Sequence, residues 1–192
     1  MLAPLSTLKL RHGIVPTDTT QDALLTHFLE AVSARFDREC RRTLARTVDA
    51  THEFRADETT IILPCYPLES IGKFEFKTTE STGWQLQTPD HLIRRHSIIN
   101  LLEPLGTAAE LARITYTGGY VLPGTTPAPG QFTLPKDLEA AAAEQAATWF
   151  QRRDLLGLIR YWPNTGTYLV ISQAPLLLSV QALLRKHERW SC

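Results

Sequence analysis

The side chains of this 192-residue chain best suited to bind a metal or carry catalysis are its histidines and cysteines. No two histidines stand at metal-ligand spacing on a predicted helix, and HExxH is absent; they are His12, His27, His52, His91, His96 and His187. The cysteines, Cys40, Cys65 and Cys192, are an odd number without paired spacing, which suits neither a disulfide framework nor a zinc site. The sequence therefore predicts free thiols, no metal and no cofactor.

Motifs for nucleophilic catalysis and phosphate binding are absent as well. The chain contains no GxSxG, Walker or GxGxxG motif. Cys65 lies in a stiff Leu-Pro-Cys-Tyr-Pro segment without a catalytic signature, so we interpret it as a small, half-buried apolar residue. Asp57 and Glu58 are adjacent in a predicted turn, and a paired-carboxylate site would need a further partner. We expect a protein that is not an enzyme.

The first predicted helix ends in a basic cluster, which consists of Arg35, Arg38, Arg41, Arg42 and Arg46. One interpretation is a face toward nucleic acid or an acidic partner, which would make the chain a nucleic-acid-binding module. The other is a solvated helix end, which the helix dipole favours and which Asp37 and Glu39 offset. The 20 basic and 20 acidic residues give a net charge of zero, which excludes a general nucleic-acid coat but leaves a local stripe open.

The hydrophobic periodicity predicts an α+β fold in a single domain, residues 1–192. Helices are expected at about 20–42, 134–153 and 175–188, with an antiparallel β-rich module at 51–117 between the first and second. Residues 1–18 are expected to form a loosely structured arm, and residues 168–192 a C-terminal helix and tail. Strands are expected at 52–55, 60–63, 71–77, 84–87, 91–94, 97–101 and 112–117. No apolar run approaches the length of a membrane span.

Spacing within these elements predicts which faces are buried. The first helix places Leu25, Phe28, Leu29, Val32 and Phe36 on one side, after a Thr19–Asp22 capping box. In the β-rich module Phe74 and Phe76 are expected inside, with Lys73, Glu75 and Lys77 on a wet face. The alanine-rich middle helix, opened by Pro135, is expected to let another helix approach closely.

Several segments resemble the head–tail connector (adaptor, or head-completion) proteins of tailed bacteriophages. The main ones are the strand end Tyr116-Thr117-Gly118-Gly119-Tyr120 and the helix start Leu134-Pro135-x-Asp137-Leu138, in an alanine-rich helix that ends Trp149-Phe150-x-x-Arg153. Earlier in the chain, Ile61-Ile62-Leu63-Pro64 and Tyr66-Pro67-Leu68 follow in the same order. The ordered set carries the resemblance, because no single piece is specific.

The resemblance implies a structural virion protein, or its equivalent in a prophage or gene transfer agent, made in the host bacterial cytoplasm. Such proteins form a ring, typically a dodecamer, between the portal and the stopper or tail-completion protein. The ring extends the channel through which genomic DNA passes, without sequence-specific or membrane contacts.

On this basis three surfaces are candidate interaction sites. The candidate portal contact is on the last helix and tail: Leu176, Val180, Leu183, Leu184, His187 and Trp190. The candidate face toward the DNA channel or an acidic partner is the cluster Arg35, Arg38, Arg41, Arg42 and Arg46. The candidate inter-subunit or stopper-docking loop carries Tyr120, Pro123, Pro127, Pro129 and Phe132.

Overall fold

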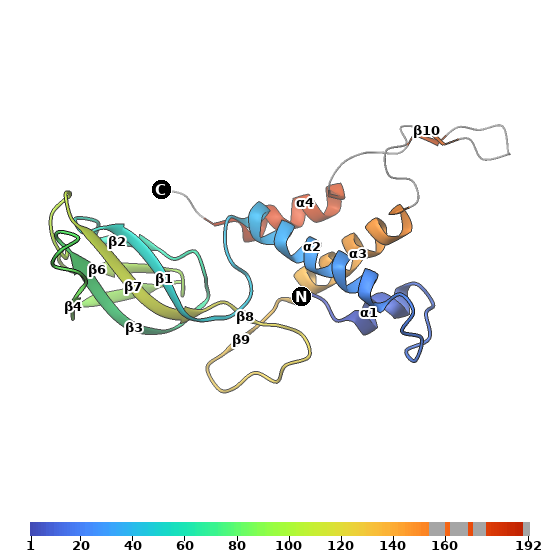
Figure 1. Ribbon diagram of the computed structural model, residues 1–192, viewed down its shortest axis with the longest axis horizontal. Coiled ribbons are helices and arrows are strands. Elements are labelled where there is room, and N and C mark those ends of the chain that lie inside the picture. The colour runs from blue at the N-terminus through green and yellow to red at the C-terminus, as the bar shows by residue number, and fades with distance from the viewer. Residues whose placement is uncertain (154–159, 162–168, 171–175, 190–192) are drawn as a thin grey trace. The chain divides into compact units, whose positions relative to one another are not determined.

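The computed structural model describes residues 1–153, 160–161, 169–170 and 176–189. The chain divides into two compact units, each made of segments that are distant in the sequence. The helical unit contains Met1–Phe36 and Pro135–His187, and the β-rich unit contains Asp37–Leu134 and the segment that starts at Glu188 (Figure 1). The antiparallel sheets lie between the second and third helices in the sequence, which confirms the predicted α+β class.

Four α-helices occur among the described residues: α1 (Leu5–Arg11), α2 (Asp22–Cys40), α3 (Lys136–Gln151) and α4 (Leu178–Leu184), the last continued by the 3₁₀ turn η2 (Arg185–His187). A short antiparallel pair, β10 (Arg160–Tyr161) with β11 (Leu169–Val170), precedes α4. The predicted face of α2 is confirmed, since Leu25, Leu29, Val32 and Phe36 are fully buried. Phe28 is half-buried and packs edge-on against Phe150 of α3, with 6.3 Å between ring centres.

The N-terminal segment is more ordered than its sequence suggested. Residues Leu5–Arg11 form α1, with Pro4 as the N-cap residue, where we expected an irregular arm. The amine of Lys9 holds this segment, because it binds the Asp22 carboxylate at 2.6 Å and donates to the carbonyl of Asp18 at 2.8 Å. Asp22 therefore pairs with Lys9, whereas the capping box had assigned it to Thr19. Leu8 is fully buried, whereas Leu10 is 81% exposed.

Helix α3 carries the predicted small-residue face, and one polar side chain on it anchors α4. Five of its alanines are buried: Ala141, Ala142, Ala143, Ala146 and Ala147. Gln145 is only 1% exposed, and its Oε1 accepts a hydrogen bond from the backbone N–H of Leu177 at 2.8 Å. Leu177 is the N-cap residue of α4 and has no side chain able to cap the helix. Gln145 thus satisfies a backbone donor that would otherwise be orphaned at the start of α4.

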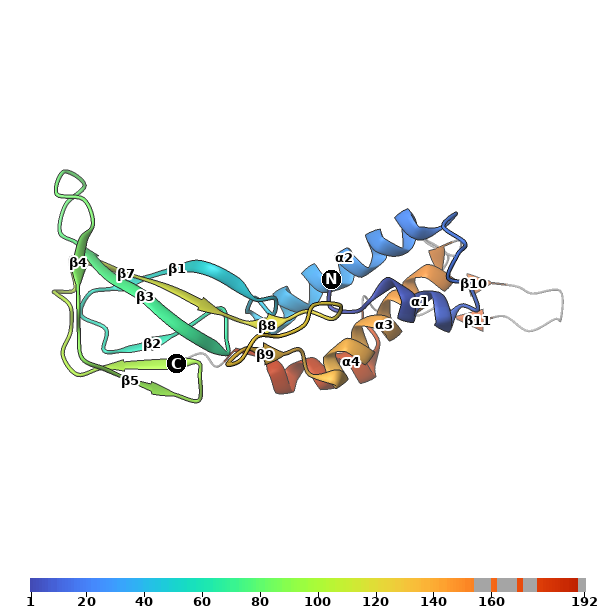
Figure 2. The same ribbon diagram turned by 90° about the horizontal axis from the view of Figure 1, so that it is seen from below.

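The β-rich unit contains two antiparallel sheets that face each other (Figure 2). The four-stranded sheet has the order β1-β7-β3-β4, and the three-stranded sheet has the order β2-β6-β5. Their strands are β1 (Thr47–Arg55), β2 (Thr60–Ile62), β3 (Leu68–Lys77), β4 (Gln85–Gln87), β5 (His91–Arg94), β6 (Ile98–Leu101) and β7 (Leu111–Gly118). Every strand expected from the sequence is present, and β1 and β3 begin earlier than expected.

The core of this unit lies between the two sheets. Phe54, Phe74, Ile114 and Tyr116 from the larger sheet join residues of the smaller one in a single buried cluster, which also includes Ile61, Ile99 and Leu101. The hydroxyl of Tyr116 accepts a hydrogen bond from the Cys65 backbone N–H at 3.0 Å, so this buried polar group is satisfied. Burial raises the pKa of Tyr116 to about 12, which keeps the hydroxyl neutral.

The outer face of the larger sheet is less open to water than its alternation predicted. Glu75 is only 7% exposed, because it accepts hydrogen bonds from Arg113 at 2.7 Å and from Lys73 at 2.9 Å. Burial alone would raise the pKa of Glu75, but these two partners outweigh it and hold that pKa below its ordinary value. The Arg113 guanidinium also lies 4.2 Å from the centre of the Trp84 ring. A charge cluster under an aromatic ring therefore replaces the expected solvated face.

The turn after β7 brings three backbone segments into contact through two glycines. A Cβ on Gly118 would lie 2.7 Å from the carbonyl oxygen of Cys65, and one on Gly119 would lie 2.6 Å from that of Ala45. Gly119 also has φ +98°, a conformation that favours glycine. Its N–H donates to Pro67 O at 2.8 Å, so the close approach is fixed by a backbone hydrogen bond.

We predict that Gln145→Leu, which keeps the side-chain volume, destabilises the helical unit by about 1–3 kcal/mol, because it leaves the Leu177 N–H without its acceptor. Denaturant titration followed by circular dichroism measures the loss. The matched control is Gln151→Leu at the exposed end of the same helix, for which we expect little change. Equal midpoints for the two variants would contradict the anchoring role.

Gly119→Ala is predicted to cost more stability than Gly124→Ala. Both glycines have positive φ, +98° and +92°, so both substitutions carry the same backbone penalty of about 1 kcal/mol. Only at Gly119 would the added methyl group also meet backbone atoms, because no atom lies within 4 Å of a Cβ at Gly124. Thermal melts of the two variants compare the costs, and an equal loss would show that the contact at Gly119 is unimportant.

Candidate functional site

The candidate interaction site is the proline loop, which we define as residues 122–131. Its ends are joined by a parallel pair, β8 (Tyr120–Val121) with β9 (Phe132–Thr133), so the loop leaves and re-enters the β-rich unit at one place. Its sequence, LPGTTPAPGQ, contains no ionisable side chain. Pro127 and Pro129 are exposed and Pro123 is half-buried. The loop therefore presents an uncharged surface of restricted backbone conformation.

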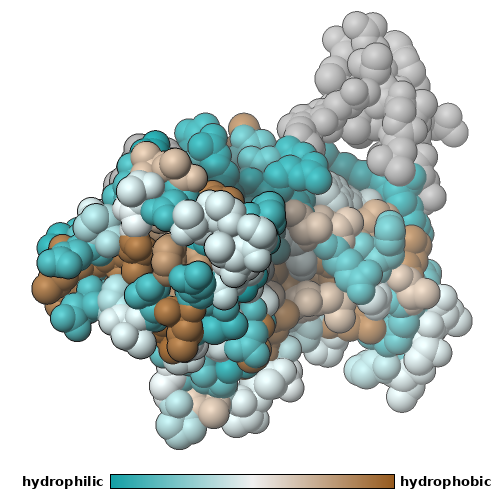
Figure 3. Space-filling model, turned by 60° about the vertical axis from the view of Figure 1, so that its left-hand side comes forward, coloured by the Kyte–Doolittle hydropathy of each residue, from teal (hydrophilic) through white to brown (hydrophobic). Residues whose placement is uncertain are grey.

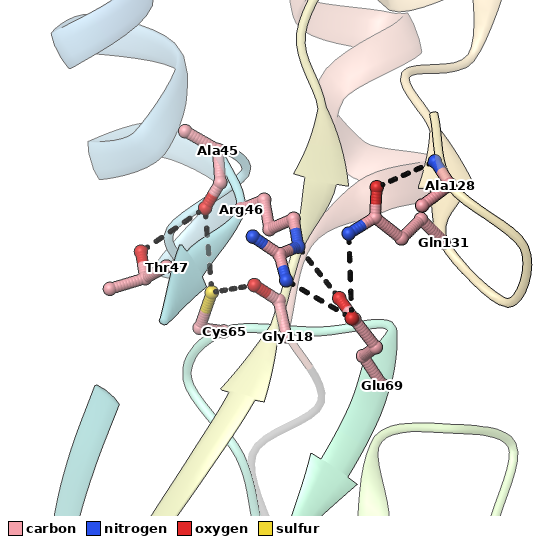
Figure 4. A network of polar contacts seen from close by, with 8 residues as sticks. All are labelled: Ala45, Arg46, Thr47, Cys65, Glu69, Gly118, Ala128 and Gln131. Atoms are coloured by element: carbon pink, nitrogen blue, oxygen red, sulfur yellow. Dashed lines mark hydrogen bonds and ion pairs between the residues drawn. The ribbon is translucent and has the colours of Figure 1, made fainter. Parts of the chain in front are cut away.

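A carboxylate at the start of β3 fixes the base of this loop (Figure 4). Glu69 accepts two hydrogen bonds from Arg46, from Nε at 2.7 Å and from the terminal nitrogen at 3.0 Å. Gln131 lies 3.5 Å from the same carboxylate through Nε2, and its Oε1 accepts the N–H of Ala128 at 3.0 Å. Hydrogen bonding to Arg46 holds the pKa of Glu69 below its ordinary value, so the carboxylate stays charged at neutral pH.

Arg42 forms the second support of the loop base. Its guanidinium carbon lies 3.3 Å from the centre of the Tyr66 ring and 5.3 Å from that of Tyr120, and it donates a hydrogen bond to Tyr66 O. Arg42 is only 5% exposed, so its charge is shielded by two aromatic faces. On the other side of the loop Phe132 packs against His96, with 5.0 Å between ring centres. Tyr120 and Phe132 thus have partners within the β-rich unit, whereas Pro127 and Pro129 are exposed.

Cys65 lies in the same region, but its environment opposes reactivity. It is 3% exposed, and its Sγ lies 3.2 Å from the carbonyl oxygen of Gly118 and 3.5 Å from that of Ala45 (Figure 4). Burial raises the pKa of the Cys65 thiol, and it raises that of Cys40 to about 11. A thiol that stays protonated is a poor nucleophile. The interpretation of Cys65 as a small packing residue agrees with this geometry.

The five arginines grouped by the sequence are not equivalent in the structure. Arg42 and Arg46 are used by the loop base. Arg41 is exposed and pairs with Glu188 at 3.3 Å, and Arg38 is exposed, whereas Arg35 is half-buried. At most Arg38 and Arg41 offer their charge directly to solvent, which is a small basic surface for a nucleic acid.

The candidate portal residues of the last helix are not equivalent either, because they differ in burial. Leu176, Val180 and Leu184 are 1–3% exposed and belong to the core of the helical unit. His187 is half-buried, with its Nε2 3.3 Å from the Asp137 carboxylate of α3, and Leu183 is half-buried; Trp190 lies outside the described residues. The exposed face of α4 consists instead of Leu178, Ser179, Ala182 and Arg185, of which Leu178 is 79% exposed. The helical periodicity of α4 indicates this face as the side opposite to the one that was singled out from the sequence.

One surface was not singled out from the sequence. A groove of about 600 Å³ lies beside β3, β4 and β5, and its lining includes Ile71, Phe74, Leu86, His91 and Ile93. Leu86 and Ile93 are 65% and 49% exposed. The short strands were predicted, but sequence spacing does not tell which sheet edge is left open.

Among the described residues no cluster of His, Cys, Asp or Glu could hold a metal, and no helix is long and apolar enough to cross a membrane.

Comparisons with known proteins find similarity in structure only. No protein-family model and no curated protein matches the sequence. A chain in the neck of an empty gene transfer agent (GTA) particle, computed with C6 symmetry, matches with a TM-score of 0.62 and 14% identity, over 100% of this chain and 91% of that one. A chain in the virion of a native GTA particle matches with a TM-score of 0.59 and 15% identity, over the same shares. At these identities the likeness establishes a shared fold across the whole chain.

Proposed function

We propose that this protein is a structural component of the neck of a phage-like particle, where copies form an adaptor ring between the portal and the stopper or tail. The observation that carries the proposal is the full-length fold similarity to a chain from a particle neck. The resemblance of the ordered sequence segments to head–tail connectors also supports it, and one of these segments is the Gly118-Gly119 turn, which makes close backbone contacts. In this role the protein would be located in the virion and would not be an enzyme.

A ring subunit must present two different side surfaces, because a heterologous contact closes into a ring only at a set rotation. The similar neck structure was computed with C6 symmetry, which is compatible with a ring of six or twelve copies. We propose a dodecamer, with genomic DNA passing through its channel without specific contacts. The low number of exposed, unshielded arginines in the basic cluster suits a channel that must release DNA.

Two surfaces of the protein suit the other contacts. The proline loop is uncharged, so burying it against a neighbouring subunit or the stopper carries no cost of desolvating a charge. Its prolines also reduce the conformational entropy that binding would remove. For the portal we propose the exposed side of α4 around Leu178, together with the C-terminal tail.

The direct test is to delete the gene from a producing strain and to examine the particles by cryo-electron microscopy. We expect heads that package DNA but lack attached tails, because the ring that joins them is missing. Supplying the chain in trans should restore complete particles with matching density between portal and tail. Complete particles in the deletion strain, or a neck without this density, would refute the proposal.

We further predict that replacing residues 123–130 by glycine and serine, at equal length, leaves the melting temperature nearly unchanged but lowers the yield of tailed particles at least about tenfold. The loop lies outside the core, so stability is preserved, whereas the apolar docking surface is lost. The matched control is a glycine–serine replacement of the exposed turn residues Ser81 and Thr82. Normal yield from the loop variant would exclude the loop from partner binding.

A further inference from the structure

An exposed basic segment forms one edge of the three-stranded sheet. Among the strands that the structure describes, β5 pairs with β6 alone, and all residues from His91 to His96 are exposed. Arg95 and His96 have φ +52°, which makes a tight turn after β5 and leaves both arginines, Arg94 and Arg95, at the surface. Among the described residues neither arginine has an acidic partner within ion-pair distance. We call residues 91–96 the basic edge.

The basic edge is also apolar. Leu92 and Ile93 are 57% and 49% exposed on opposite faces of β5, and Ile93 lines a groove together with Ile71 and Phe74 of β3. The surface view of the β-rich unit shows apolar side chains exposed among hydrophilic ones (Figure 3). Water-exposed leucine and isoleucine next to two arginines are typical of a protein-binding surface, whereas a phosphate backbone would leave the apolar side chains uncovered.

A complementary surface occupies the free edge of the four-stranded sheet. Strand β1 has β7 as its single partner in the described part of the chain, and its exposed residues include Val48, Asp49, Thr51 and Glu53. Val48 is 56% exposed, and no arginine or lysine among the described residues forms an ion pair with Asp49 or Glu53. We call residues 48–53 the acidic edge. β1 is one edge of the four-stranded sheet and β5 is one edge of the three-stranded sheet, so the acidic and basic edges belong to different sheets.

We propose that the acidic edge of one copy docks on the basic edge of the next copy. Two properties match: carboxylates meet arginines, and Val48 meets Leu92, which shares a face of β5 with Arg94. The irregular register between Thr47 and Ala50, with Asp49 at φ +52°, prevents a continuous strand ladder, so side chains make the contact. Because the two surfaces differ, the contact is heterologous and repeats from copy to copy. This inference rests on the proposed ring and names one of its subunit contacts.

The experiment is a charge swap between two variants of the full-length chain. Arg94→Glu/Arg95→Glu makes the basic edge acidic, and Thr51→Lys/Glu53→Lys makes the acidic edge basic; Asp49 is kept, because aspartate tolerates its φ of +52° better than lysine does. We expect each variant alone to self-associate at least about tenfold more weakly than the wild type in low salt, by analytical ultracentrifugation. An equimolar mixture should regain association, because each variant then meets an oppositely charged edge.

A cross-linking variant detects a weak contact that sedimentation would miss. In a Cys192→Ser background, Glu53→Cys/Arg94→Cys should give a ladder of disulfide-linked oligomers on mild oxidation, while Glu53→Cys alone should not extend beyond dimers, because Cys40 and Cys65 are buried. Normal melting temperatures in all variants show that the fold is intact. If the cross-linked ladder is absent and the equimolar mixture does not regain association, the inference is overturned. This holds even if density in the neck of particles supports the proposed ring. Loss of binding to a short DNA duplex by Arg94→Glu/Arg95→Glu, with self-association unchanged, also overturns it and assigns the basic edge to nucleic acid.

Discussion

The close approach of the Gly119 backbone to Ala45 and Pro67 is the constraint on which the β-rich unit depends. It brings the end of β7 against the segment that follows α2 and the segment that precedes β3. Once these three segments are joined, Tyr120 accepts a hydrogen bond from Arg46 and donates one to Leu44, both at 2.8 Å. Glu69 and Arg46 then meet, Arg42 enters between two tyrosine rings, and the proline loop acquires a fixed base. A side chain at Gly119 would disturb each of these contacts.

Local patterns were sufficient to predict most of the secondary structure. Strand alternation located the strands, and spacing of three and four located the buried face of α2, because both signals come from neighbours in the sequence. Helix α1 was missed, since its stability comes from Lys9 binding to residues beyond the helix. Glu75 was expected on a wet face, and only its partner Arg113, 38 residues away, explains its burial. The features that were predicted wrongly thus depend on contacts between segments that are distant in the sequence.

Contacts between distant segments also limit the prediction of interaction surfaces from the sequence. The arginine cluster is contiguous in sequence, yet Arg42 and Arg46 have partners 24 and 23 residues away that take them from the surface. On α4 a helical pattern indicates two faces but not which one is buried, and the packing on α3 decides this. The basic and acidic edges are recognisable only when the sheet order is known, because β1 and β5 are ordinary short strands in the sequence. The strand order, more than the composition, determines which side chains are available for binding at the surface.

The absence of any ionisable group between Leu122 and Gln131 determines how a contact made through the proline loop, as proposed above, would respond to its surroundings. A joint made through this segment is held by apolar and backbone contacts, whose strength changes little with acidity or with the salt concentration of the surroundings. A particle that leaves a bacterial cell meets both changes at once. A neck contact made through the proline loop would therefore keep its strength when acidity and salt concentration change. Contacts between opposite charges would become weaker or stronger under the same changes.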